Sequence, residues 1–143
     1  LRPTLIYGLA DPHNGYGPNR FRRLAAEGKE IVLFGEGEER RDHILIEDVA
    51  ELVFLCLRYC SQGVLNLATG TVVSFREIAD QVVAHFEQPV AVKGSQRQGP
   101  MPHNGYRPFD VAASQTAFPE VHYTPVAEGL AKVHRQMVEA GNG

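Results

Sequence analysis

Metal-ligating side chains are scarce and poorly spaced in this sequence. The 143 residues contain two cysteines, Cys56 and Cys60, and no third thiol to complete a tetrahedral site. The six histidines form neither an H-x-x-x-H nor an H-E-x-x-H pair. We therefore predict no metal site, and we interpret the two cysteines as buried packing thiols in a reducing cytoplasm.

Long hydrophobic runs and an excess of positive charge are also missing. No apolar run approaches the roughly 20 residues that a membrane-spanning helix needs, and no charged-then-apolar leader opens the chain. The net charge of -3 and the pI near 6.1 provide no cationic field for nucleic acid or acidic membranes. We predict a cytoplasmic protein without nucleic-acid or membrane partners, in which anions are recognised locally.

Several catalytic sequence patterns are absent as well. No serine lies in a G-x-S-x-G context, and residues 35–38 lack the spacing of a G-x-G-x-x-G cofactor loop and carry carboxylates that would repel a pyrophosphate. None of the five tyrosines is followed by lysine at the fourth place. The chain begins at Leu1, inside an apolar strand pattern, so we expect a fragment whose missing part is N-terminal.

The patterns that are present predict an α/β fold with short strands and about five helices. Strands are expected within 1–8 and at 31–34, 41–46, 64–67 and 89–93; helices are expected at 19–27, 48–59, 74–86, 111–117 and 124–138. Residues 35–40 are expected to form a hairpin-like turn, and residues 94–108 a long loop. The strand at 64–67 is expected to be central, and the proline-led strand at 89–93 to lie at an edge.

Local signals refine three of these helices. Ser74 and Glu77 have the spacing of a capping box, and Gly28 can end the helix before it in a left-handed conformation. The segment 48–59 is apolar nearly all round, which predicts a helix buried against a sheet.

Arginine side chains are suited to binding phosphate because the planar guanidinium group can donate two parallel hydrogen bonds. Arg41 and Arg107 each lie where an irregular segment meets a regular element, so a fold could bring them to one ligand. The alternative is that they form surface salt bridges with Asp42 and Asp110. His43, beside Arg41, is interpreted as a core histidine with a satisfied ring; the alternative is a polar group that faces a ligand.

Five motifs resemble those of the extended short-chain dehydrogenase/reductase family, in the family's order. Residues 2–8 resemble its R-P-x-x-x-Y-G strand, and residues 41–50 its R-D-[FY]-[IV]-x-[VI]-x-D-[VL]-A segment. Residues 64–78 are similar to its N-[IL]-[GA]-[ST]-G run with the following helix start, residues 107–110 to R-P-x-D, and residues 128–130 to E-G-[LI]. The likeness is to the NAD-dependent nucleotide-sugar epimerases and dehydratases, and it covers nearly the whole chain.

The resemblance implies roles for particular residues. Arg41 and Arg107 would grip the diphosphate of a nucleotide sugar, and Asp110 would bind the ribose. The expected sugar-nucleotide pocket is lined by Asn19, Arg20 and Phe21, with Phe34 along the base; Pro3 and Ile6 would lie near the nicotinamide. His43 replaces the family's usual aromatic residue, and Arg20 stands where a smaller amide is common, so the sugar stays undetermined.

The resemblance also implies what the chain lacks. Residues 1–8 would be the last part of a Rossmann-side strand, and residues 9–143 a C-terminal substrate-binding domain. The Rossmann half that binds NAD or NADP, with the catalytic Y-x-x-x-K pair, would lie upstream of Leu1, so the chain alone is expected to be inactive. We expect the parent to be a homodimer. Two alternatives stay open: a reductase of a non-nucleotide carbonyl compound, and a non-catalytic relative that binds NAD(P) or RNA.

Overall fold

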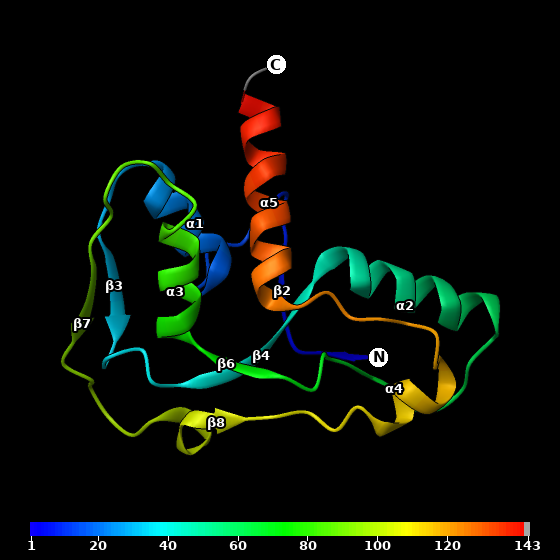
Figure 1. Ribbon diagram of the computed structural model, residues 1–143. Coiled ribbons are helices and arrows are strands. Elements are labelled where there is room, and N and C mark those ends of the chain that lie inside the picture. Colours follow the sequence, from blue (N-terminus) through cyan, green and yellow to red (C-terminus); the bar gives the residue numbers. More distant parts are fainter. Residues whose placement is uncertain (142–143) are drawn as a thin grey trace.

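The computed structural model describes residues 1–141, which form a mixed α/β fold (Figure 1). The α-helices are α1 (Pro18–Ala26), α2 (Ile46–Arg58), α3 (Phe75–Val83), α4 (Ala112–Ala117) and α5 (Val126–Gly141). The strands are β1 (Arg2–Pro3), β2 (Leu5–Tyr7), β3 (Ile31–Phe34), β4 (Arg40–Leu45), β5 (Asn66–Leu67), β6 (Val72–Ser74), β7 (Val92–Ser95) and β8 (Tyr106–Arg107). These bounds confirm the predicted fold class of short strands and about five helices.

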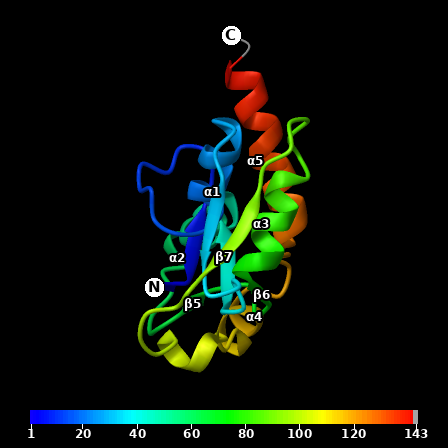
Figure 2. The same ribbon diagram turned by 90° about the vertical axis from the view of Figure 1, so that its left-hand side faces the viewer.

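Strand β4 is the centre of the fold. Its second half pairs in parallel with β2, and its first half pairs with β6 in antiparallel and with β8 in parallel register. Two further pairs stand beside it, β1 with β5 and β3 with β7, both parallel. Figure 2 shows β7 in front of α1 and α3, at the end of the molecule away from α2.

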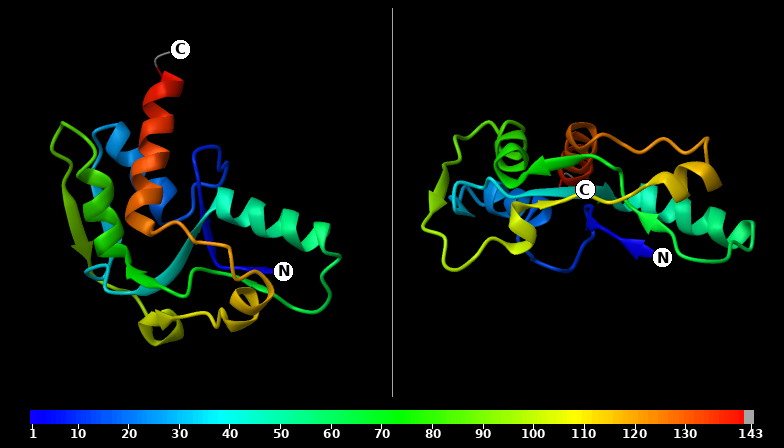
Figure 3. Two further views of the ribbon diagram at one scale, coloured as in Figure 1. Left: turned by 45° about the vertical axis from the view of Figure 1, so that its right-hand side comes forward. Right: turned by 90° about the horizontal axis from the view of Figure 1, so that it is seen from below.

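Two hydrophobic clusters hold the helices around β4. Because successive side chains of a strand point to opposite faces, Leu45 joins a cluster with α1, α3 and α5, whereas Ile44 joins one with α2 and Phe118. Both side chains are fully buried. Figure 3 shows the result: α1, α3 and α5 gather on one side, and α2 extends toward the other.

The local helix signals are confirmed. The Ser74 hydroxyl accepts a hydrogen bond from the Glu77 amide at 3.1 Å, and the Glu77 carboxylate accepts one from the Ser74 amide at 2.8 Å. Gly28, just after α1, has a φ of 64°, which is the left-handed conformation that the sequence predicted.

The hairpin-like turn at 35–40 is a wrong prediction. Gly35 and Gly37 do adopt left-handed φ values of 61° and 78°, but the strands on either side, β3 and β4, pair with other strands. The Gly37 carbonyl accepts a hydrogen bond from the Arg76 amide at 3.0 Å. The turn is therefore held by the start of α3 and passes the chain from one sheet to the next.

Helix α2 is not buried all round, contrary to the prediction. Val49 and Leu52 face the core, but the side chains of Phe54 and Leu57 are 58% and 73% exposed. The described residues supply packing partners on one side of the helix alone. Cys60, which follows α2, is also exposed, so its interpretation as a buried thiol is wrong; Cys56 is half-buried.

Two strand predictions and one loop prediction need adjustment. Among the described strands β5 pairs with β1 alone, so it is not central. The strand predicted at 89–93 begins at Val92, beyond Pro89, and pairs with β3 alone, as an edge strand should. The loop predicted at 94–108 contains the end of β7, a 3-10 turn at Pro102–Gly105 and β8. Within 1–141, no helix is both long and apolar enough to cross a membrane.

Candidate functional site

A cavity of about 380 Å³ opens where β2, β3, β4 and β8 converge. Eleven residues line it: Pro3, Thr4, Leu5, Tyr16, Phe34, Glu39, Arg41, Phe75, Pro102, Arg107 and Phe109. They come from seven separate stretches of the chain. A volume of this order is typical of small-molecule sites.

Arg41 and Arg107 are brought side by side at this cavity. They are direct partners in the parallel pairing of β4 with β8, and residues that share a register position lie on one face of the sheet. Sequence reasoning selected both arginines as anion-binding candidates. The two arginines are far apart in the sequence, and only the pairing of β4 with β8 brings them together.

Neither arginine has the carboxylate partner that the salt-bridge alternative proposed. Arg41 pairs with Glu39, donating from Nε at 2.6 Å and also from Nη2. Arg107 contacts His103 Nε2 at 3.3 Å, and its guanidinium lies 5.5 Å from the centre of the Phe109 ring. Among the described residues, the guanidinium of Arg107 is therefore contacted by two rings and has no carboxylate partner.

Asp42 is held away from Arg41 by the alternation of the strand. Its carboxylate is fully buried and accepts hydrogen bonds from the Thr69 amide and hydroxyl at 3.0 and 3.1 Å and from the Gly70 amide at 2.7 Å. Burial raises its pKa, and these hydrogen bonds act in the opposite direction. Asp42 anchors the loop after β5 and takes no part in the cavity.

Three aromatic rings form one wall of the cavity. The Tyr16 ring lies 4.5 Å from that of Phe34 and 4.7 Å from that of Phe75, measured between centroids. The Tyr16 hydroxyl accepts a hydrogen bond from the Phe34 amide at 3.0 Å, and burial raises its pKa. The Phe34 side chain is 56% exposed, so this wall can contact a flat ligand group.

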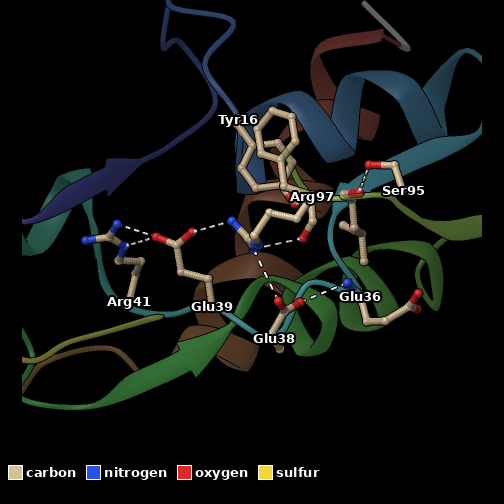
Figure 4. A network of polar contacts seen from close by, with 9 residues as sticks. Tyr16, Glu36, Glu38, Glu39, Arg41, Ser95 and Arg97 are labelled. Carbon is tan, nitrogen blue, oxygen red and sulfur yellow. Dashed lines mark hydrogen bonds and ion pairs between the residues drawn. The ribbon is translucent and has the colours of Figure 1, made fainter. Parts of the chain in front are cut away.

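A chain of charged groups lies behind the cavity (Figure 4). Arg97 donates to the Phe34 carbonyl at 3.1 Å and pairs with Glu38 at 3.4 Å and with Glu39 at 3.9 Å. The other oxygen of Glu39 contacts Arg41. Sequence reasoning missed Tyr16, Glu39 and Arg97, because no local spacing links the loop at 94–108 to the turn after β3.

Asn19, Arg20 and Phe21 lie outside the cavity. Asn19 is buried; it accepts a hydrogen bond from the Gly8 amide at 3.2 Å and donates one to Asp11 at 2.6 Å. Arg20 is exposed, whereas Phe21 is buried in the core with its ring 5.1 Å from that of Tyr16. Phe21 therefore supports the aromatic wall from behind.

The other predicted residues are divided between two places. Pro3 and Phe34 line the cavity, while Ile6 and Asn19 line a neighbouring hollow of about 270 Å³. Asp110 is exposed outside the cavity; its carboxylate accepts a hydrogen bond from the Ala112 amide at 2.9 Å.

His43 lies beneath the cavity with no exposed surface. Its Nδ1 is 3.2 Å from the Arg41 carbonyl, and its ring packs edge-on against Phe75 with 5.5 Å between centroids. Within the described part of the chain its Nε2 has no partner, so the predicted satisfied ring is wrong for this nitrogen. Burial lowers the pKa of His43 to about 4. The residues from 1 to 141 contain no cluster of His, Cys, Asp or Glu fit for a metal ion.

Known structures share this fold. UDP-N-acetylglucosamine 4-epimerase from Methanobrevibacter ruminantium, in complex with UDP-N-acetylmuramic acid, has a TM-score of 0.81 at 17% identity, over 97% of this chain and 45% of its own. An epimerase from Methanothermobacter thermautotrophicus has a TM-score of 0.85 at 19% identity, over 99% of this chain and 43% of its own. A GDP-L-fucose synthetase from Naegleria fowleri, bound to NADP, has a TM-score of 0.82 at 17% identity, over 98% of this chain and 45% of its own.

The chain thus spans less than half of each of these proteins. Residues 1–68 match the model of the NAD dependent epimerase/dehydratase family, and this stretch contains β4 with Arg41. The structural likeness extends the same fold over almost all of the remaining residues. Sequence motifs and the match over residues 1–68, just under half of the chain, indicate the NAD-dependent epimerase/dehydratase family, and the fold agrees with this indication.

Proposed function

We propose that this chain is the substrate-binding part of an NAD-dependent nucleotide-sugar epimerase or dehydratase, and that the cavity between β4 and β8 holds the diphosphate of a nucleotide sugar. One observation carries the proposal: Arg41 and Arg107 are register partners on adjacent strands, and both line the cavity. Two guanidinium groups on one face can each donate hydrogen bonds to a diphosphate, which carries charge on both phosphates.

The aromatic wall extends the proposal to the nucleotide. Phe34 is exposed at the cavity and packs at a tilt against Tyr16, so a base that extends from the diphosphate in that direction would contact aromatic rings. The epimerase from Methanobrevibacter ruminantium, which shares the fold, is described in complex with a UDP-sugar. Asp110, Asn19 and Arg20 lie outside the cavity, and their roles toward ribose and sugar stay predictions.

The nicotinamide cofactor would meet this chain at β1 and β2. Pro3 and Leu5 line the cavity, Ile6 is 39% exposed beside it, and these apolar side chains fit the face of a nicotinamide ring by van der Waals contact. When bound, NAD or NADP would supply hydride transfer. The sequence of this chain contains no tyrosine with lysine at the fourth place, so we assign proton transfer to the rest of the parent protein.

The parent architecture follows from the same proposal. We retain residues 9–143 as the substrate-binding domain and residues 1–8 as the end of a Rossmann-side strand, in a chain that is inactive by itself. Localisation in the cytoplasm and a homodimeric parent remain predictions.

Arginine truncation in the full-length protein tests the proposal. A charge-assisted hydrogen bond contributes about 1.5–3 kcal/mol, so Arg41→Ala or Arg107→Ala should weaken UDP binding by about 10- to 100-fold. Isothermal titration calorimetry with UDP and dTDP measures this directly. Arg20→Ala is a matched control, because Arg20 is exposed outside the cavity. Unchanged affinity in both cavity variants, or no affinity of the parent for either nucleotide, would favour the carbonyl reductase alternative.

A further inference from the structure

A carboxylate lines the cavity beside Arg41, and this is unexpected in a site for a diphosphate. Glu39 is buried, with its side chain 9% exposed, and it is one of the cavity residues. Its negative charge would repel a phosphate at short range. The contacts of Glu39 indicate what offsets this repulsion.

Glu39 occupies one defined edge of the Arg41 guanidinium. Oε1 accepts from Nε at 2.6 Å and from Nη2, the two nitrogens on the side edge of the group. The contacts of Arg41 within residues 1–141 use Nε and Nη2, which leaves the Nη1 donors at the opposite end for a ligand in the cavity. The Arg41 side chain is itself 13% exposed and lines the cavity.

Arg97 fixes Glu39 in turn. Its Nη1 lies 3.9 Å from Oε2 of Glu39, while its Nη2 donates to the Phe34 carbonyl at 3.1 Å and pairs with Glu38 at 3.4 Å. Figure 4 shows the resulting row from Arg97 through Glu39 to Arg41. Arg97 offsets part of the negative charge of Glu39, and Arg41 thereby keeps part of its attraction for an anion.

We propose that Glu39 is a positioning residue that holds the side edge of Arg41 and thereby turns its Nη1 end toward the diphosphate, with Arg97 as the anchor of Glu39. The diphosphate as the ligand rests on the proposed function, whereas the orientation of Arg41 does not. The contribution of Glu39 as hydrogen-bond acceptor therefore exceeds that of its charge.

Two substitutions in the full-length protein separate these contributions. Glu39→Gln keeps an oxygen acceptor for Arg41 and removes the charge, whereas Glu39→Ala removes both. We expect Glu39→Ala to raise the KM for the UDP-sugar and the Kd for UDP about tenfold with kcat nearly unchanged, and Glu39→Gln to restore both to within about threefold. Glu36→Ala is the matched control, because Glu36 is an exposed neighbouring carboxylate that points away from Arg41 (Figure 4).

A measurement without ligand tests the orientation alone. The Nε–H proton of Arg41 can be assigned because its NMR signal is lost in Arg41→Lys. This proton should exchange slowly with solvent in the unsubstituted protein and in Glu39→Gln, and rapidly in Glu39→Ala. This NMR readout also decides the case if Glu39→Ala fails to fold, because rapid exchange in the parent or in Glu39→Gln overturns the proposal.

The outcomes distinguish this inference from the proposed function. If Arg41→Ala abolishes UDP binding while Glu39→Ala binds UDP as the parent does, the positioning role is wrong and the diphosphate site stands. If Glu39→Gln weakens binding as much as Glu39→Ala, charge and not hydrogen bonding is decisive, which also overturns the inference. If Arg41→Ala leaves UDP binding intact, the proposed function fails, and the exchange rates still decide the orientation.

Discussion

Replacing His43 by phenylalanine should remove a specific acid sensitivity of the fold. The imidazole is fully buried, its Nε2 has no partner within the described residues, and burial lowers its pKa from 6.5 to about 4. In the unfolded chain the ring titrates near 6.5, so the unfolded state takes up a proton as the pH falls below this value and the folded state does not. The stabilising contribution is therefore complete above pH 6.5 and is lost progressively as the pH falls toward 4.

The size of the effect follows from the two pKa values. The protonation of His43 in the unfolded state lowers the free energy of unfolding by about 2 kcal/mol at pH 5 relative to neutral pH, and by about 3 kcal/mol at the acid limit. Phenylalanine keeps an edge-to-face contact with Phe75, which lies 5.5 Å from the His43 ring, and it has no proton to gain. Any difference in stability at pH 7.5 that has another cause cancels when the two pH values are compared.

Urea denaturation of the purified protein at pH 7.5 and 5 measures this difference. Between the two pH values, we expect the free energy of unfolding to fall by about 2 kcal/mol less in His43→Phe than in the unsubstituted protein. His122→Phe is the control, because His122 is exposed. Parallel stability curves for parent and His43→Phe would refute the reasoning, as would an NMR titration that placed the pKa of His43 near 6.5.

Two further predictions concern helix packing and capping. Gly129→Ala should destabilise the protein by about 1–3 kcal/mol, since an added Cβ would collide with the buried Tyr7 hydroxyl, whereas Gly141→Ala in the same helix meets open space and should be neutral; thermal melts of the two variants make the comparison, and equal melting temperatures would contradict it. Ser74→Ala should cost about 1 kcal/mol through loss of the bond to the Glu77 amide, measured by chemical denaturation, with Ser74→Thr expected to recover most of it.

Features that depend on neighbouring residues were predictable from the sequence. The capping box needs two residues three apart, and the left-handed end of α1 needs one glycine, so both are specified within a single turn of chain. The motifs around residues 2–8, 41–50, 64–78 and 107–110 likewise indicated the family before any contact was known. The same motifs selected Arg41 and Arg107 as anion-binding candidates.

Features that depend on pairing between distant segments were not. The turn at 35–40 looked like a hairpin because both flanks have strand patterns, yet β3 found its partner in β7 and β4 found its partners in β2, β6 and β8. The exposed face of α2 was unpredictable for a related reason, since a hydrophobic pattern shows that a side chain can be buried and not which segment covers it.

By itself, then, the sequence determined the types of element, their caps and the identity of the two arginines. The tertiary structure alone decided that Arg41 and Arg107 are register partners, that the rings of Tyr16 and Phe34 pack together at the same cavity, and that Glu39 lies between Arg41 and Arg97. The physical reason is that strand register and buried ion pairs are set by packing over the whole core, whereas propensity and capping act over a few residues.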